Sequence, residues 1–389
     1  MGYSSRKKQS LIRVIVVYPI LSRYFIGSKS TFWERTMELM FNAQQILQRG
    51  KGLTFDDVLM IPRHSEIASR RIPTLNSKAT KNYEIETPII SANMDTVTGV
   101  EMACAMAKLG GLGILHRFMS PEEQVEDVKR IQNYIKENNL KGPVAASIGV
   151  KEEGKLRAKL LADIGVEILT IDIAHGDSVM MLDTLEYVKK TWPHIDVIAG
   201  NVATGEGVRR MIDLGADAVK VGIGPGSMCT TRIITGHGVP QLTAIAMCVD
   251  EAMKHGVPVI ADGGIKTSGD IVKALCAGAQ TIMAGSLLSG TLETPGELKG
   301  GMKEYRGMAS KAAQVSWRGE LPKGMAAEGV DTMVPCKGSV ADVVSELTGG
   351  LRSGMTYLGV DNIAAMMEVG LFMEMSASGM TESRPHGKA

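Results

Sequence analysis

Three features that would narrow the class of a protein at once are missing from this sequence: paired cysteines, a strong net charge and a long apolar run. The five cysteines are widely spaced and form no CxxC pair, so neither a disulfide framework nor a zinc site is predicted. The formal net charge is +1 at pH 7, which gives no reason to expect nucleic acid as a partner. No stretch approaches the roughly 18 apolar residues that a membrane span needs, so no membrane association is predicted. These absences favour a cytoplasmic protein with reduced thiols.

Hydrophobic residues and glycine are what the sequence has in plenty. Hydrophobic residues make up 44% of the 389 residues, which is enough for a globular core and excludes disorder for most of the chain. Glycine accounts for 44 residues, above the usual proportion of roughly 7%. Because glycine lets the backbone turn tightly and approach a ligand closely, a binding site is expected in the loops.

The first fifty residues differ in charge from the rest of the chain. They hold eight basic and two acidic residues, and no acidic residue precedes Glu34. An acid-poor segment rich in Arg and Ser is typical of an organelle transit peptide, and the basic and then apolar run 7–21 weakly resembles a signal peptide. A gene start set too early, with the true start at Met37 or Met40, explains the same pattern. Residues 1–50 are therefore assigned to an N-terminal extension, and an organelle replaces the cytoplasm as the predicted location only if they are a transit peptide.

From residue 88 onward, short β-branched runs alternate with amphipathic helical stretches. This alternation is typical of a parallel sheet wound with helices. Helices are expected at 121–137 and 155–163 among others, with Ser120 and Ser268 as N-caps. The eight runs that predict strands are 88–95, 111–117, 143–149, 166–174, 195–203, 217–224, 257–264 and 281–290.

Eight β/α units in about 200 residues predict an α/β protein with the (β/α)8 TIM-barrel fold, in which the active site lies at the carboxyl ends of the strands. A doubly wound open sheet is the alternative, because the sequence does not show whether the sheet closes. The barrel is assigned to residues 51–375 as a single domain, with a flap near 308–330 and a C-terminal tail at 376–389.

Glycines follow the seventh and eighth predicted strands. The seventh ends in Asp262, Gly263 and Gly264, and the eighth in Gly285 and Ser286. Barrel enzymes commonly hold a phosphate after these two strands, with glycine amides and a helix N-terminus. The two turns together predict a phosphorylated substrate. Asp262 could accept both hydroxyls of a ribose, which would make that substrate a nucleotide, and its simpler role is to cap the next helix.

The loop after the sixth predicted strand, GPGSMCTTR at 224–232, is the most informative segment. It presents one thiol, that of Cys229, among backbone amides and beside Arg232. Positive charge and oriented amides favour the thiolate, which is the nucleophilic form of cysteine. We interpret Cys229 as a nucleophile. The carbonyl oxygens of so tight a loop also suit a monovalent cation.

Five segments of the sequence together resemble the IMP dehydrogenase and GMP reductase family, over about residues 51–375: LTFDDVL (53–59), NMDTV (93–97), GPGSMCTTR (224–232), IADGG (260–264) and LRSGMTYLG (351–359). The resemblance implies a cysteine that attacks C2 of the purine ring of a nucleoside monophosphate and forms a covalent thioimidate. The dehydrogenase branch then passes hydride to NAD and hydrolyses the adduct. The reductase branch instead expels ammonia from GMP and delivers hydride from NADPH, which gives IMP.

Three features favour the reductase branch. Only about 25 residues separate the second and third strands, which leaves no room for the CBS modules that the dehydrogenase usually carries there. The flap segment 308–328 has the length of the reductase flap and contains no tyrosine, whereas the dehydrogenase activates water with an Arg-Tyr pair. Ser69 and Arg70 match a reductase segment that contacts the cofactor, and Arg70 with Arg117 suits the 2′-phosphate of NADPH.

The resemblance implies roles residue by residue. Cys229 matches the nucleophile, and Thr231 and Glu328 match the hydroxyl and carboxylate that relay a proton to the departing amine. The cofactor positions are matched by Ser69, Arg70, Arg117, Asp172, Ile173, Ala174, Met308 and, from a neighbouring subunit of a homotetramer, Ser353, Gly354, Met355 and Thr356. The positions that hold GMP or IMP are matched by Ser227, Asp262, Gly263, Gly264, Gly285, Ser286, Gly307, Met308, Ala309, Glu328 and Gly329. The potassium-binding positions (K⁺) are matched by Gly224, Gly226, Cys229 and Arg232.

Several alternatives stay open beside the reductase. Segment 265–275 and the tail ESRPHG read more like the dehydrogenase, and Ala309 replaces a reductase serine. The reductase commonly has an arginine shortly before the position of Glu328. The nearest cation to that position in this sequence is Lys323, which leaves NADH as an alternative to NADPH. A nucleotide sensor without turnover and a barrel enzyme for another phosphorylated substrate are further alternatives.

Three polar residues near strand ends also have simpler roles. His116 and His175 lack a third partner at metal-ligand spacing, so hydrogen-bonding roles are predicted for them. Asp172 ends the fourth strand, where capping of the next helix is the simpler role.

Overall fold

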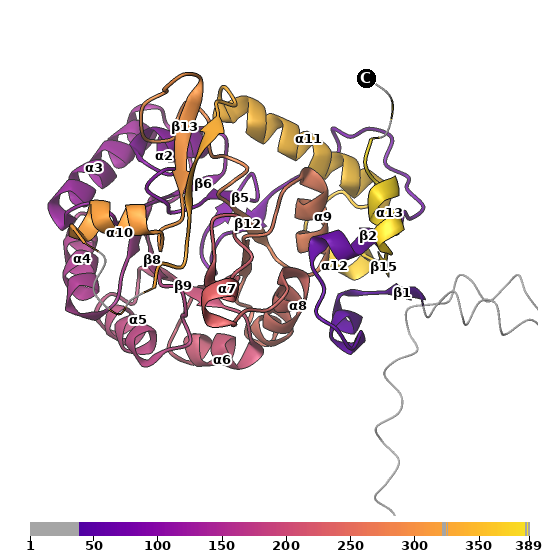
Figure 1. The fold of residues 1–389 in the computed structure, drawn as a ribbon, viewed down its shortest axis with the longest axis horizontal. Helices are drawn as coiled ribbons and strands as arrows, with labels where there is room; N and C mark the ends of the chain where they lie inside the picture. Colours follow the sequence, from indigo (N-terminus) through magenta and orange to yellow (C-terminus); the bar gives the residue numbers. More distant parts are fainter. Residues whose placement is uncertain (1–38, 321–323, 325, 386, 388–389) are drawn as a thin grey trace, which may run out of the picture. The chain divides into compact units, whose positions relative to one another are not determined.

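Eight parallel strands close into a barrel in a computed structural model of the chain, which describes residues 39–320, 324, 326–385 and 387 (Figure 1). The strands are β5 (Ile89–Ser91), β6 (Leu112–Leu115), β7 (Ala145–Ile148), β8 (Ile168–Asp172), β9 (Asp196–Val202), β10 (Ala218–Val221), β11 (Val259–Asp262) and β12 (Thr281–Ala284). The register places Ile282 of β12 beside Ile89 of β5, and this pairing closes the sheet. The closed ladder confirms the predicted barrel and rules out the open sheet. Each of the eight strands lies within the run predicted for it.

A helix follows every barrel strand and covers the outside of the barrel (Figure 1). In order, the helices are α2 (Val100–Lys108), α3 (Pro121–Glu137), α4 (Lys151–Asp163), α5 (Val179–Thr191), α6 (Gly205–Asp213), α8 (Gln241–Ala252), α9 (Ser268–Cys276) and α11 (Val340–Leu358). The helix predicted at 121–137 is confirmed, and the one predicted at 155–163 begins earlier, at Lys151. A single helix, α3, connects β6 to β7, so the barrel carries no inserted module there, as predicted.

Hydrogen bonds from side chains to the first turn set where two of these helices begin. At α3, Ser120 Oγ accepts from Glu123 N at 3.2 Å, and the Glu123 carboxylate accepts from Ser120 N at 2.8 Å, which confirms Ser120 as the N-cap. At α9 the same reciprocal pair is formed by Thr267 and Asp270, so the predicted N-cap Ser268 is wrong by one residue. The reason is that Asp270 stands three residues after Thr267, which is the spacing of a capping box.

The alternation of side chains along the strands divides the core into two clusters. Ile168 of β8 and Ile260 of β11 lie inside the barrel, whereas Leu169 and Ile171 of β8 pack under the helices. Successive side chains of a strand point to opposite faces, so both faces of each strand are buried. Most polar side chains are therefore left to the strand ends, and the carboxyl ends of all eight strands meet at one mouth.

A small sheet joins the two ends of the compact unit Met40–Ala389. Strand β1 (Met40–Phe41) pairs with β15 (Phe372–Glu374), which also pairs with β2 (Val58–Met60). The rings of Phe41 and Phe372 stack with centroids 5.8 Å apart. Residues 40–50, which the charge pattern assigned to the N-terminal extension, thus take part in this unit. The transit-peptide and signal-peptide predictions fall mainly on residues 1–38, which lie outside the described residues.

Between β12 and α11 the chain forms the flap. Strands β13 (Met302–Arg306) and β14 (Asp331–Pro335) make an antiparallel pair, and α10 (Lys311–Arg318) lies between them in sequence and beside α3 and α4 in space (Figure 1).

The shorter elements are η1 (Ala43–Gln48), η2 (Phe55–Asp57), β3 (Ser77–Lys78), β4 (Glu84–Ile85), α7 (Thr231–Thr235), η3 (Met253–His255), α12 (Met366–Val369) and α13 (Ala377–Glu382). Among the described residues, no helix combines the length and the apolar character needed to cross a membrane.

Candidate active site

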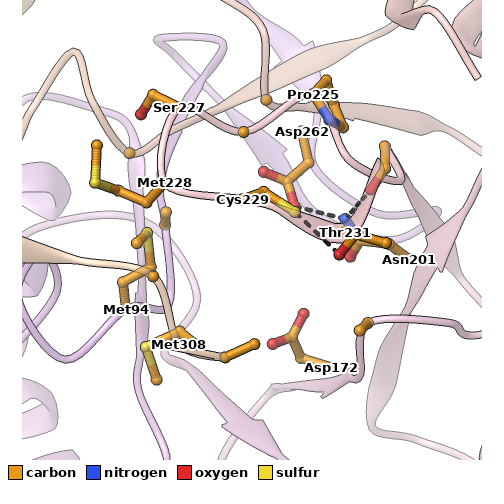
Figure 2. Close-up of a pocket in the computed structure, with 18 of the residues that line it drawn as sticks. Met94, Asp172, Asn201, Pro225, Ser227, Met228, Cys229, Thr231, Asp262 and Met308 are labelled. Atoms are coloured by element: carbon orange, nitrogen blue, oxygen red, sulfur yellow. Dashed lines mark hydrogen bonds between the residues drawn. The ribbon is translucent and has the colours of Figure 1, made fainter. Parts of the chain in front are cut away.

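A cavity of about 510 Å³ opens at the carboxyl ends of the barrel strands, between the strand ends and the flap (Figure 2). Met94, Met228 and Met308 line one side of it, and Asp262 and Asn201 lie on the opposite side. Most residues that the sequence assigned to the site line this cavity: Arg117, Asp172, Ile173, Ala174, Gly224, Gly226, Ser227, Cys229, Thr231, Asp262, Gly263, Gly264, Gly285, Ser286, Gly307, Met308, Ala309 and Glu328. Residues far apart in the sequence therefore share one chamber, as the mouth of a barrel requires.

Cys229 is held at the cavity by the turn that precedes it. Gly224 has a φ of +82°, a conformation that favours glycine, and Cys229 N donates to Gly226 O at 3.0 Å. The Cys229 thiol donates to Thr231 Oγ1 at 3.2 Å, and Thr231 Oγ1 donates to Glu328 Oε2 at 2.7 Å. A thiol, a hydroxyl and a carboxylate thus form an unbroken chain along which a proton can pass.

Backbone hydrogen bonds bring the flap residue Glu328 to the cysteine loop. Glu328 O accepts from Thr230 N at 3.0 Å, and Met228 O accepts from Val330 N at 3.0 Å. Gly329 lies between these two bonds, and a Cβ on it would come within 3.1 Å of Met228 O. This close approach favours a residue without a side chain. Gly329 therefore serves the site by letting the two segments meet, and it does not line the cavity itself.

The predicted nucleotide end of the cavity is built largely from backbone. Gly263 and Gly264 have φ values of +94° and +79°, so the turn after β11 favours glycine at both positions. A Cβ on Gly285 would lie 3.0 Å from the hydroxyl of Tyr305, which lies 3.3 Å from Ser227 Oγ. Burial raises the pKa of Tyr305, so its hydroxyl stays protonated. Glycine amides and two hydroxyls are donors that suit a phosphate.

A buried lysine that the sequence analysis did not single out joins two of the acidic residues of the cavity, Asp172 and Asp262. Lys220 Nζ lies 2.9 Å from Asp172 Oδ1 and 2.7 Å from Asp262 Oδ2, and it also donates to Asn201 Oδ1. Burial opposes the charge of Lys220, but the two carboxylates outweigh it and raise the pKa of the lysine. Burial likewise opposes the charge of Asp172, yet Lys220 and Arg117 lower its pKa overall. The signal in the sequence was an ionisable residue inside an otherwise apolar strand.

The predicted cofactor end is formed by the loop after β6 and by α10. Arg117 and Phe118 of this loop line the cavity, and the ring of Phe118 stacks on Trp317 of α10 with centroids 5.6 Å apart. The Arg117 guanidinium lies 5.3 Å from the centroid of the Phe118 ring. A cation beside an aromatic surface can pair with an anionic group and support a planar ring.

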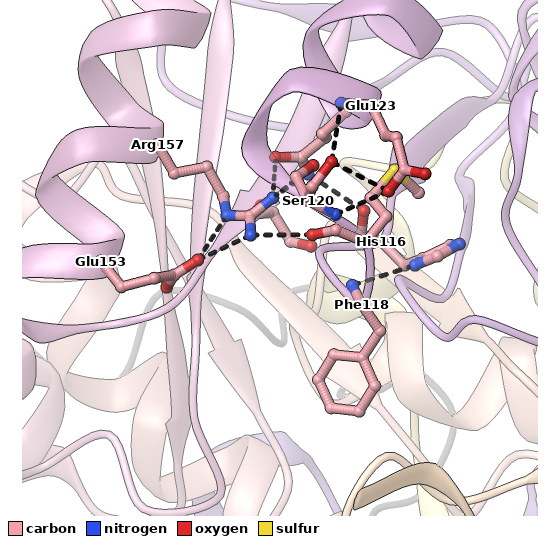
Figure 3. A network of polar contacts seen from close by, with 9 residues as sticks. His116, Phe118, Ser120, Glu123, Glu153 and Arg157 are labelled. Carbon is pink, nitrogen blue, oxygen red and sulfur yellow. Dashed lines mark hydrogen bonds and ion pairs between the residues drawn. The ribbon is translucent and has the colours of Figure 1, made fainter. Parts of the chain in front are cut away.

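A polar network behind this loop fixes its position (Figure 3). His116 Nδ1 accepts from Phe118 N at 3.1 Å, and burial lowers the pKa of His116 to about 4, so the ring is neutral and able to accept. The buried guanidinium of Arg157 donates to Gln124 Oε1 at 3.0 Å and pairs with Glu153 at 2.6 Å. The hydrogen-bonding role predicted for His116 is confirmed, and the residue supports the loop from behind.

Some residues that the sequence assigned to the site lie outside the cavity lining. Ser69 and Arg70 are exposed in the segment that precedes the barrel. Residues 353–356 lie within α11, and their predicted contribution concerns the cofactor pocket of a neighbouring subunit, so it stays a prediction. Arg232 donates to Val239 O at 2.6 Å and contacts the cysteine loop from outside the cavity.

A metal ion could be held either by side chains or by the backbone carbonyls of the cysteine loop. His175 is exposed, and in the part of the chain that the structure describes no group of three or more His, Cys, Asp or Glu side chains could hold a metal ion. The predicted K⁺ site differs, because its ligands would be backbone carbonyls of the cysteine loop. Gly226 O already accepts from Cys229 N, and a carbonyl oxygen has a second lone pair that can contact a cation. The loop therefore suits a monovalent cation, whose binding stays a prediction.

Known proteins resemble this chain over nearly all of the compact unit. The family model of the IMP dehydrogenase / GMP reductase domain matches residues 52–386. The chain belongs to the IMP dehydrogenase/GMP reductase family. Membership makes it an enzyme of a family of oxidoreductases that act on purine nucleotides, and it agrees with the resemblance of the five sequence segments.

Members of the family with both names are similar to this chain. Inosine-5′-monophosphate dehydrogenase of Cryptosporidium parvum is 44% identical over 87% of this chain and 95% of its own length. GMP reductase of Leishmania donovani is 34% identical over 86% of this chain and 97% of its own length. The crystal structure of a cysteine-to-alanine variant of Trypanosoma brucei GMP reductase in complex with guanosine 5′-monophosphate has a TM-score of 0.81 at 31% identity, covering 89% of this chain and 100% of that one.

Proposed function

We propose that this protein is a GMP reductase, which converts GMP to IMP and ammonia with NADPH as the hydride donor. The observation that carries the proposal is the hydrogen-bonded chain from Cys229 through Thr231 to Glu328, with distances of 3.2 and 2.7 Å. Both branches of the family resemblance begin with a cysteine adduct, so the groups that act after it decide the reaction. A carboxyl group at this point can protonate a leaving amine, which the reductase needs and the dehydrogenase does not.

The proton balance of the first half-reaction fits this chain of groups. Cys229 Sγ bonds to C2 of the guanine ring, and the thiol proton passes through Thr231 Oγ1 to the Glu328 carboxylate. Glu328 then returns the proton to the 2-amino group. The bond between C2 and this nitrogen breaks with its electron pair on nitrogen, and ammonia leaves. A thioimidate remains on Cys229. The nicotinamide cofactor, when bound, would supply a hydride to C2. The bond between C2 and Cys229 Sγ would then break with its electron pair on sulfur, which releases IMP and regenerates the thiolate.

The flap sequence supports the same proposal. Residues 308–328 contain no tyrosine, and Arg318 is followed by Gly319, so the Arg-Tyr pair that the resemblance implies for the dehydrogenase is missing from this segment. Hydrolysis of the cysteine adduct requires an activated water molecule. Without that pair, a dehydrogenase reaction is expected to stall after hydride transfer.

The proposal assigns the nucleotide to the ends of β11 and β12. The amides of Gly263, Gly264 and Gly285 would hold the phosphate, because the turn of two left-handed glycines leaves no side chain in the way. Asp262 would accept the ribose hydroxyls. Its Oδ2 atom already accepts from two side chains, Lys220 at 2.7 Å and Asn201 at 2.9 Å, so Oδ1 is the atom assigned to the ribose.

The proposal assigns the cofactor and the cation to the remaining parts of the site. Residues 172–174 and Met308 line the cavity beside Arg117, whose guanidinium suits a phosphate group of NADPH. K⁺ would bind the carbonyls of the cysteine loop 224–232 and keep that loop in its tight turn. A homotetramer would add residues 353–356 of a neighbouring subunit to the cofactor pocket.

IMP dehydrogenase is the second candidate, and two observations favour it. The Cryptosporidium parvum protein with that name is 44% identical to this chain, whereas the Leishmania donovani protein named GMP reductase is 34% identical. Segment 265–275 also resembles the dehydrogenase. Sequence identity over the whole chain, however, is determined mainly by the barrel, which both enzymes share. The flap carries the groups of the second half-reaction.

An assay of the purified protein in both directions tests the proposal. With GMP and NADPH we expect NADPH oxidation, ammonia release and IMP formation in equal amounts, and the same assay with NADH measures the cofactor preference. With IMP and NAD we expect no sustained formation of XMP. Steady reduction of NAD in the presence of IMP would overturn the proposal in favour of the dehydrogenase. Tight GMP binding without turnover in either direction would overturn it in favour of a nucleotide sensor.

A further inference from the structure

Lys220 is a charged side chain of the cavity that the proposed reaction does not use. It lies in the interior of β10 between Val219 and Val221, and its relative exposure is 2%. A buried ammonium is unfavourable unless opposite charges and acceptors match it. A lysine at this position therefore needs partners that justify its burial.

Side chains from three other strands match this ammonium. Lys220 Nζ lies 2.9 Å from Asp172 Oδ1 at the end of β8 and 2.7 Å from Asp262 Oδ2 at the end of β11. It also donates to Asn201 Oδ1, which comes from β9. An ammonium has three donors, so each of them has one partner. Asn201 Nδ2 in turn donates to Asp262 Oδ2 at 2.9 Å and Gly222 O at 2.7 Å, which ties the amide into the same network (Figure 2).

These contacts connect the two ends of the cavity. Asp262 is assigned to the ribose of the nucleotide, and Asp172 to the neighbourhood of the nicotinamide. Because both carboxylates bind one nitrogen atom, neither can turn away without leaving a buried charge short of a partner. The nitrogen therefore links the orientations of two groups that meet different ligands.

We propose that Lys220 is a positioning residue that couples the nucleotide end and the cofactor end of the cavity by holding the carboxylates of Asp262 and Asp172 in fixed orientations. This coupling rests on the proposed function in one respect only, which is the assignment of a ligand to each of the two carboxylates. Both branches of the family act on a purine nucleotide with a nicotinamide cofactor, so the coupling applies to either reaction.

The charges around the two carboxylates make the proposal testable by pH. Asp172 faces Arg117 as well as Lys220, whereas Asp262 faces Lys220 and the neutral hydroxyl of Tyr305. Replacing Lys220 by methionine would leave Arg117 as the cation that offsets the burial of Asp172. The pKa of Asp172 should then rise, because desolvation favours the protonated form. Cofactor binding that needs the ionised form should be lost at a higher pH than in the natural protein.

The experiment compares Lys220→Met with a matched control, Lys303→Met. Lys303 is also buried, with 3% exposure, but its Nζ donates to the backbone oxygens of Leu292 at 3.0 Å and Thr294 at 2.5 Å. Its loss removes a buried ammonium without touching the two carboxylates. For Lys220→Met we expect the Kd for GMP and IMP and the KM for the cofactor each to rise at least about tenfold, a difference of about 1.4 kcal/mol. We also expect the acid limb of the pH profile for the cofactor KM to move to higher pH, and Lys303→Met to show neither effect.

Calorimetric binding of GMP and IMP keeps this test independent of the reaction, because it reports on Lys220 even if the protein turns over neither nucleotide. Unchanged affinity and an unchanged acid limb in folded Lys220→Met would overturn the proposal. An equal loss in Lys303→Met would also overturn it, because the effect would then follow from lost stability alone. If Lys220→Met does not fold, Lys220→Arg replaces it: the retained charge should keep the acid limb in place, and an upward shift in that variant would contradict the coupling.

Discussion

The two walls of the cavity differ in how the chain holds them. The barrel wall carries Asp262, which ends β11, and Cys229, which lies in the loop 224–232 that follows β10 of the closed parallel sheet. The flap wall carries Glu328, which reaches the cysteine loop through single backbone hydrogen bonds. The flap is further joined to the barrel by an ion pair between Arg306 and Asp95. The nucleophile and the nucleotide cradle thus belong to the more constrained wall, and the proton donor belongs to the other.

This difference separates two steps of the proposed reaction. The barrel wall would bind the nucleotide and form the cysteine adduct, and the flap wall would decide what becomes of the adduct. Similar proteins with the two names, dehydrogenase and reductase, resemble this chain over the same barrel, which agrees with a shared first step. Substitutions in the barrel wall are therefore expected to remove the reaction, and substitutions in the flap to change its later steps while nucleotide binding is kept.

The largest effect is expected for Cys229→Ala in the barrel wall. The variant lacks the atom that bonds to C2, so turnover with GMP should fall by at least about 10³-fold while GMP still binds. Mass spectrometry of the natural protein with GMP should find the covalent adduct, and the variant should show none. Cys336→Ala is the matched control, since Cys336 lies outside the cavity, and it should keep its activity. Activity that survives in Cys229→Ala would contradict the covalent step.

The next effect is expected for Glu328→Gln in the flap wall. An amide cannot return a proton to the leaving amine, so ammonia release should slow by about 10²-fold or more. The Kd for GMP should change little, because the phosphate and ribose contacts are assigned to the barrel wall. Glu320→Gln, an exposed change in the same flap, is the control and should retain the natural rate. An equal loss of GMP affinity in Glu328→Gln would show that the two walls do not act separately.

A smaller effect is expected for Trp317→Ala, which removes the ring that stacks on Phe118. Aromatic pairs contribute about 0.5–1.5 kcal/mol beyond area burial, so the KM for the cofactor should rise by about 3- to 10-fold. The Kd for GMP should stay within about twofold of the natural value, because Phe118 lies at the predicted cofactor end of the cavity. Trp317→Phe retains a ring and should restore most of the affinity. A change confined to GMP binding would reverse the assignment of the two ends.

The smallest effect is expected for Ser120→Ala, which removes the N-cap of α3 behind the loop that carries Phe118. Loss of such a cap costs about 1 kcal/mol of the free energy of unfolding, measured by chemical denaturation. Ser120→Thr keeps both the acceptor for Glu123 N and the hydroxyl that donates to Glu123 Oε2, so it should retain most of that stability. If both substitutions cost the same, the cap does not act through its oxygen atom.

The fold could be predicted well because its signals are local. All eight barrel strands lie within the predicted runs, since each run depends only on alternation and on the turn residues that bound it. An error arose where a helix boundary depended on side-chain hydrogen bonds, as at Thr267, whose reciprocal pair with Asp270 moves the N-cap by one residue. The charge pattern of residues 1–50 carries no signal for the contact between Phe41 and Phe372, because these residues lie far apart in the sequence.

Part of the site could also be predicted, because its signals are local in the sequence. Cys229 and the glycines of 263–264 stand in short segments whose residue types already suggest their chemistry. Tyr305 could not be found that way, because it approaches Ser227 only after the flap has folded over the barrel. The charge of Lys220 within an apolar strand is visible in the sequence. Its role can be interpreted only when the structure shows which side chains contact it.

The amino-acid order is sufficient for the eight strands, the N-cap Ser120 and the turn that exposes Cys229, because these depend on neighbours along the chain. Only the folded chain decides that Glu328 meets Thr231, 97 residues away, and that Lys220 meets Asp262, 42 residues away. The favourable energy of such contacts depends on burial, and barrel closure creates that burial by bringing β12 to β5.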